Sequence, residues 1–177
     1  NFEFLKKKID ENKQEYNNTE IVLENIALGA ENKIIEFNQF NESSSSTIKE
    51  IDKESKYYKR KFRLINFLNN KEKSQKIKIK ISKLKEYIEK NNIKKIDFMK
   101  IDTEGYEFEI LLGLESKIKL VDIIMFEHHY DNMIKKGYTF EDINKLLIKN
   151  NFNKIYKSRM PFRKTFEYIY KREELIN

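Results

Sequence analysis

Two short clusters of polar residues are the best candidates for chemistry, because each stands at the end of an apolar run. The first reads Lys-Ile-Asp-Thr-Glu-Gly at 100–105 and closes the run at 96–101; the second reads Glu-His-His-Tyr-Asp at 127–131 and follows the run at 121–126. Their carboxylates and imidazoles could remove a proton, bind hydroxyl groups or hold a divalent cation. If the two runs are neighbouring parallel strands, about 4.8 Å apart, their carboxyl ends share one edge of the sheet. We therefore expect four side chains to converge on one cleft: Asp102, Glu104, Glu127 and His128.

The elements that would position these clusters alternate between strand and helix patterns from residue 76 onward. Strand patterns occur at 76–81, 96–101, 121–126, 152–156 and 165–170, and helix patterns at 84–88, 106–114 and 138–151. Ser82 and Thr139 are suitable N-caps for the first and last of these helices. This order predicts an α/β fold with an open, mostly parallel sheet, helices on both of its faces and a C-terminal antiparallel hairpin.

The first 75 residues are less regular. Apolar spacing predicts a helix at 2–16, and two short β-branched runs at 20–28 and 33–40 predict strands joined at Gly29 by a hairpin or sharp reversal. Residues 41–75 show no clear periodicity, which at this length indicates a mobile insertion, a lid or a binding loop. The basic and aromatic stretch at 57–63 is open to two interpretations, a contact for nucleic acid or glycan and a solvated surface.

The composition excludes several classes of protein. A length of 177 residues suits one domain, and the absence of cysteine excludes disulfides and thiolate chemistry and favours a cytoplasmic protein. We find no apolar run long enough for a membrane span and no signal-peptide pattern. The net charge of +7 comes from lysines interleaved with acidic residues, which predicts a solvated basic surface and no nucleic-acid partner.

The segment at 96–107, Ile-Asp-Phe-Met-Lys-Ile-Asp-Thr-Glu-Gly-Tyr-Glu, resembles the signature of the FkbM methyltransferase family, which is roughly I-D-x-x-K-I-D-x-E-G-x-E. Shorter blocks agree with the family in order and spacing: Asn25-Ile26-Ala27-Leu28-Gly29, Leu111-Leu112-Gly113, Phe126-Glu127 and Gly137-Tyr138-Thr139-Phe140. The similarity covers about residues 20–170. Two departures are Leu84-Lys85, where the family commonly carries an Asp, and the 41–75 insertion, which matches nothing in the family pattern.

The resemblance implies a Rossmann-like class I methyltransferase sheet and methyl transfer from S-adenosylmethionine, usually to a hydroxyl of a sugar or another secondary metabolite. Such a transfer is an in-line displacement, accelerated by holding the acceptor oxygen in line and removing its proton. The candidate catalytic residues are Asp102, Glu104 and His128, and the candidate substrate-binding residues are Glu127 and Lys100. Asn25 and Ala27 are the candidates for contacting the cofactor, the acceptor is a small molecule or glycan, and no metal ion is expected.

Other roles for the same residues stay open. Asp102 or Thr103 could cap the following helix, and His128 could have a structural role. Glu104 could simply be stabilised by the dipole of that helix, because it lies near the helix N-terminus. The four polar side chains could instead hold a divalent cation. At the level of the whole chain, the alternatives are a non-catalytic remnant or binding module of the same fold and a basic nucleic-acid-binding domain.

The positions of the glycines indicate how much of a cofactor-binding site the chain contains. The four glycines stand at 29, 105, 113 and 137, so the chain contains no G-x-G turn of the kind that holds the cofactor in this architecture. The first strand, its Gly-rich loop and the acidic end of the second strand are not recognisable. We therefore expect residues 1–177 to be a single, partial methyltransferase domain truncated at its N-terminus, with an exposed edge on the strand at 96–101.

Overall fold

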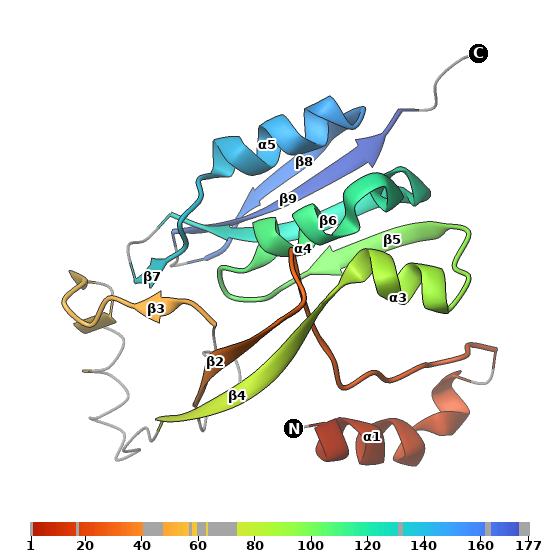
Figure 1. Cartoon of the computed structure of the whole chain (residues 1–177), viewed down its shortest axis with the longest axis horizontal. Coiled ribbons are helices and arrows are strands. Elements are labelled where there is room, and N and C mark those ends of the chain that lie inside the picture. The colour runs from red at the N-terminus through yellow and green to blue at the C-terminus, as the bar shows by residue number, and fades with distance from the viewer. Residues whose placement is uncertain are drawn as a thin grey trace.

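A computed structural model describes residues 2–16, 18–40, 48–56, 58–59, 63, 74–130, 133–161 and 164–173. The fold is mixed α/β, with two main sheets and helices beside them (Figure 1). The elements in chain order are α1 (Phe2–Glu11), η1 (Lys13–Tyr16), β1 (Ala27–Gly29), β2 (Lys33–Phe40), β3 (Glu50–Ile51), β4 (Ser74–Lys83), α3 (Leu84–Lys90), β5 (Ile96–Ile101), α4 (Glu107–Leu114), η3 (Glu115–Leu120), β6 (Val121–His129), β7 (Ile134–Lys135), α5 (Phe140–Lys149), β8 (Phe152–Arg159) and β9 (Thr165–Arg172).

The larger sheet has the strand order β5-β6-β9-β8. β5 and β6 are parallel neighbours, with Ile96 opposite Val121 and Ile101 opposite Phe126, and α4 lies between them in the chain. β9 lies between β6 and β8 and is antiparallel to both. The predicted parallel pair, the helix that connects it and the C-terminal hairpin are therefore confirmed, and β5 is an edge strand of this sheet.

The smaller sheet has the order β1-β4-β2. β1 runs parallel to the end of β4, and β2 runs antiparallel along its length, so that Ile81 lies opposite both Ala27 and Lys33. The chain does reverse sharply after Gly29, as predicted. The predicted hairpin is wrong, because β4 lies between β1 and β2, and the strand predicted at 20–28 is confined to Ala27–Gly29.

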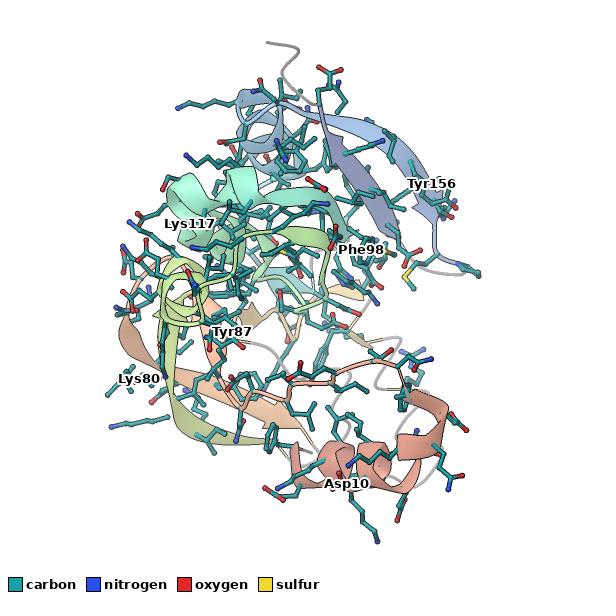
Figure 2. The ribbon with its side chains drawn as sticks, turned by 90° about the vertical axis from the view of Figure 1, so that its right-hand side faces the viewer. Asp10, Lys80, Tyr87, Phe98, Lys117 and Tyr156 are labelled. Carbon is teal, nitrogen blue, oxygen red and sulfur yellow. The ribbon has the colours of Figure 1, made fainter. Side chains whose placement is uncertain are left out.

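The prediction of a mostly parallel sheet is wrong. Of the six described strand pairs, only β1·β4 and β5·β6 are parallel. The short connection between β8 and β9 does not provide the long crossover that a parallel pair requires. Helices on both faces were also expected, but α3, α4 and α5 lie on the same face of the larger sheet (Figure 1). On its other face Phe98 and Tyr156 are about half exposed and lie on the side away from Lys117 (Figure 2).

The core lies between the helices and the larger sheet. Ile101, Phe126 and Tyr168 are neighbours on three adjacent strands and are all buried. The ring of Phe126 stacks on that of Tyr168, with 5.5 Å between centroids. The helices contribute buried leucines and isoleucines to the same cluster: Ile88, Leu111, Leu114, Ile143 and Leu147.

Helix ends agree with the sequence where a side chain makes the cap. Thr139 is the N-cap of α5, and its side chain and that of Asp142 form a reciprocal capping box. Ser82 is not a cap, because β4 continues to Lys83 and α3 begins without a side-chain cap. The helix predicted at 2–16 ends at Glu11 and is followed by the 3-10 turn η1.

Only part of the 41–75 insertion can be compared with its prediction. β3 pairs antiparallel with β7, so this part of the insertion is anchored beside the segment that precedes α5. Residues 41–47, 57, 60–62 and 64–73 lie outside the described residues, and with them most of the basic and aromatic stretch.

Candidate active site

The loop between β5 and α4 is organised around a buried carboxylate, that of Glu107. Its Oε1 accepts hydrogen bonds from the backbone N–H of Gly105 at 2.9 Å and from the N–H and hydroxyl of Thr103 at 3.3 and 3.2 Å. Glu107 is only 1% exposed. The turn requires positive φ at Glu104 (49°) and Gly105 (97°), and a Cβ at Gly105 would lie 2.7 Å from Ile134 Cγ2. Glycine is therefore suited to position 105 both by its conformation and by its size.

The same carboxylate also binds the segment that leads into α5. The Tyr138 hydroxyl donates a hydrogen bond to Glu107 Oε2. Burial, and next the negative charge of Glu107, raise the pKa of Tyr138 above its usual range, so the phenol stays protonated. The ammonium of Lys49 lies 5.0 Å from the ring centre of Tyr106 and 5.8 Å from that of Tyr138, and it pairs with Glu109. Three segments that are distant in sequence therefore meet around this loop.

Polar side chains gather at the carboxyl ends of β5 and β6, which we call the rim. Lys100 Nζ lies 3.2 Å from Asp102 Oδ2, and both side chains are nearly half exposed. Their hydrogen bond raises the pKa of Lys100. Glu127, only 8% exposed, has a pKa raised first by burial and second by the negative charge of Asp102. The structure therefore brings Lys100, Asp102 and Glu127 together, as their positions after neighbouring parallel strands indicated.

Glu104 joins the rim through a histidine that the sequence did not single out. Glu104 Oε2 lies 3.2 Å from His129 Nε2, and His129 Nδ1 lies 3.0 Å from Thr165 Oγ1. His129 and Thr165 are also opposite each other in the β6·β9 register. Glu127 stands two residues before His129 on β6, so its side chain points to the same face of the strand as His129.

His128, by contrast, does not reach the rim. Successive strand residues point to opposite faces, so His128 lies on the helix-covered face of β6 and Glu127 and His129 on the other. Its ring makes edge contacts with Tyr130 (4.8 Å) and Phe140 (5.8 Å). Burial, and next the charge of Lys136, lower the pKa of His128 to about 3. Of the four side chains predicted to converge, His128 therefore lies apart from Asp102, Glu104 and Glu127.

Two other interpretations can be compared with the geometry. The N-cap position of α4 is Tyr106, so neither Asp102 nor Thr103 caps this helix, and Thr103 bonds Glu107 instead. Within the described ranges the structure brings together no group of three or more His, Asp or Glu side chains that could hold a metal ion.

A cavity of about 640 Å³ lies between the smaller sheet and the loop that follows β5. Asn25 and Ala27, the two candidates for cofactor contact, line one side of it, and Thr103 and Tyr106 line the other. The remaining lining residues are mostly apolar: Ile26, Leu28, Phe37, Ile48, Ile77, Ile79, Lys80 and Ile110.

Four residues that shape the site were not among the sequence candidates: Glu107, Tyr138, His129 and Thr165. Glu107 and Tyr138 both lie in segments that resemble the FkbM pattern, and that was the available signal for them. For His129 and Thr165 the signal would have been the cross-strand pairing of β6 with β9.

Comparison with known families agrees with this architecture. The model of the methyltransferase FkbM domain matches residues 1–156, so the chain belongs to the FkbM methyltransferase family. The comparisons with curated proteins and with solved structures found no match. Of the helices that the structure describes, none has the length and apolar character needed to cross a membrane.

Proposed function

We propose that this domain transfers a methyl group from S-adenosylmethionine to a hydroxyl oxygen of a sugar or another secondary metabolite, and that the acceptor binds at the rim. The observation that carries the proposal is the juxtaposition, in a chain of the FkbM methyltransferase family, of Lys100, Asp102 and Glu127 at the rim. The cavity borders the same loop, because Thr103 directly follows Asp102. A cytoplasmic location is part of the proposal, since the chain has no cysteine.

The cavity suits one portion of the cofactor. Its apolar walls, which include Ile77 and Ile79, fit a flat purine ring, and the Asn25 amide and Thr103 hydroxyl could bond to the edge of that ring. Among its lining residues there is no carboxylate for a ribose diol, and the chain has no G-x-G turn. When bound, S-adenosylmethionine supplies a methyl group already activated by its sulfonium sulfur.

The rim would act on the acceptor. Asp102 is an exposed carboxylate held by Lys100. It is suited to accept the proton of the acceptor hydroxyl as the new carbon–oxygen bond forms and the bond from the methyl carbon to sulfur breaks, which would leave a neutral thioether. Burial and the negative charge of Asp102 raise the pKa of Glu127, whose carboxyl group can form a hydrogen bond with another hydroxyl of the acceptor. Holding the oxygen in line would supply much of the rate enhancement.

Asp102→Asn tests this assignment. We expect turnover to fall by about 100-fold, the usual contribution of a general base, with affinity for S-adenosylmethionine unchanged. The melting temperature should stay near that of the unaltered protein, because Asp102 does not cap α4. Transfer of a labelled methyl group would be measured over a panel of sugars and other polyols.

Asp97→Asn is the matched control. Asp97 is an exposed aspartate on β5, the strand that leads to Asp102, and its carboxylate pairs with Lys95. This variant should keep full turnover. Normal turnover in Asp102→Asn would remove the acceptor role of Asp102.

A further inference from the structure

A chain of three side chains runs from the interior of the larger sheet to the rim. Thr165, the first residue of β9, is 1% exposed, and His129, the last residue of β6, is 7% exposed. Glu104, at the outer end, has a side chain that is 22% exposed. The three therefore form a line from a buried hydroxyl, through a buried imidazole, to a carboxylate that solvent can reach.

The chemistry of the end groups fixes the hydrogens along this line. A carboxylate only accepts, so His129 Nε2, 3.2 Å from Glu104 Oε2, must carry a hydrogen. In the neutral imidazole Nδ1 is then an acceptor, and the Thr165 hydroxyl at 3.0 Å donates to it. Glu104 thereby selects the tautomer with its hydrogen on Nε2, and Thr165, whose hydroxyl can donate or accept, holds the opposite nitrogen of the ring.

The backbone supports the same geometry. Thr165 and His129 are fixed opposite each other by the β6·β9 ladder, and the N–H of Tyr130 donates to the carbonyl of Lys164 at 2.7 Å. Glu104 adopts a left-handed conformation (φ 49°) that a non-glycine residue seldom takes. An unfavourable local conformation is maintained where surrounding contacts determine it: Glu104 contacts His129, and the N–H of the next residue, Gly105, is bound by Glu107.

We propose that Thr165 and His129 are positioning residues that hold the Glu104 carboxylate at the rim, where it accepts a hydrogen bond from a second, non-reacting hydroxyl of the methyl acceptor. The inference rests on the proposed methyl transfer and specifies the class of molecule that accepts the methyl group. The acceptor would be a polyol with two neighbouring hydroxyls, one directed to Asp102 and one to Glu104. Glu104 would then contribute to acceptor binding, while Asp102 would act on the reacting oxygen.

Imidazole nitrogen spectra of the ¹⁵N-labelled protein test the hydrogen-bond chain, whether or not an acceptor is known. The chain has only two histidines, and His129→Gln identifies the signals of His129 by their loss. We expect His129 to carry its hydrogen on Nε2. Thr165→Val, which keeps the shape but removes the hydroxyl, should shift the Nδ1 signal, whereas Thr165→Ser should leave it in place.

The kinetic arm uses the same pair of variants. Thr165→Val should raise the KM for the acceptor about tenfold, the effect of loosening one hydrogen bond, with little change in kcat. Thr165→Ser should restore the KM, which loss of a merely structural contact would not predict. Melting temperatures establish that both variants are folded.

Two results would overturn the inference. One is a His129 ring with its hydrogen on Nδ1, or signals that Thr165→Val leaves unchanged. The other is an unchanged KM in Thr165→Val when its signals have shifted. Failure of the proposed function looks different, because the unaltered protein would then transfer no methyl group to any polyol, while the spectra would still decide whether the chain of hydrogen bonds exists.

Discussion

Replacing Glu107 by alanine should destabilise the domain more than any other single change at the loop after β5. The substitution leaves the N–H of Gly105 and the hydroxyl of Tyr138 without their acceptor, and weakens two longer bonds from Thr103. A buried donor left unsatisfied costs about 1–3 kcal/mol, and removal of a buried carboxylate offsets part of that loss. We therefore expect a net loss of about 3 kcal/mol in the free energy of unfolding. For a chain of this size that corresponds to a decrease of roughly 10 °C in the melting temperature.

Thermal and urea unfolding followed by circular dichroism would measure the effect. Glu107→Gln should recover part of the loss, because its amide oxygen can still accept from Gly105. The matched control is Glu141→Ala, which removes an exposed glutamate from the first turn of α5 and should change stability by about 0.5 kcal/mol or less. If Glu107→Ala were as stable as this control, the carboxylate would not be what organises the loop.

Three further predictions concern protonation, packing and the cofactor. With a pKa of about 3 in the fold against 6.5 when unfolded, His128 binds its proton more readily in the unfolded chain, so the free energy of unfolding should fall as the pH drops from 6.5 toward 3. Urea titrations should show a smaller fall in His128→Phe. Gly113→Ala should cost about 2–3 kcal/mol, because the added Cβ would lie 2.1 Å from the carbonyl oxygen of Gly29; Gly137→Ala has no atom within 4 Å and should lose only about 1 kcal/mol to its positive φ. Calorimetric titration of residues 1–177 with S-adenosylmethionine should show only weak binding, with a Kd above the micromolar range, since no Gly-rich turn is available; a micromolar Kd would contradict that reasoning, and turnover is therefore measured with the cofactor in large excess.

The parts of the fold that could be predicted are those specified by local sequence. The apolar runs of β5 and β6, the helix between them and the Thr139 cap each depend on residues close together in the chain. Strand partners depend on more. The reversal after Gly29 suggested that β1 and β2 pair with each other, but both pair with β4, 34 to 54 residues further along. Nothing in the local pattern of either strand specifies that choice.

The candidate site shows how strongly such predictions depend on where a strand ends. The apolar run at 121–126 predicts a strand that ends at Phe126, with the polar side chains after it converging at the edge of the sheet. β6 in fact continues to His129, and its alternation places Glu127 and His129 on the rim face and His128 on the opposite face. Because the strand is three residues longer than predicted, His129 lies on the rim face and His128 does not.

The cavity has walls that belong to two separately hydrogen-bonded sheets. Asn25, Ala27 and Ile79 belong to the side of the smaller sheet, and Thr103 and Tyr106 to the loop that continues the larger one. A molecule bound in the cavity would contact the smaller sheet and the loop of the larger sheet at the same time. Its binding free energy would therefore add to the contacts that stabilise the two sheets against each other. Occupancy of the cavity and rigidity of the domain would then be a single coupled equilibrium, and the melting temperature would report how much ligand is bound.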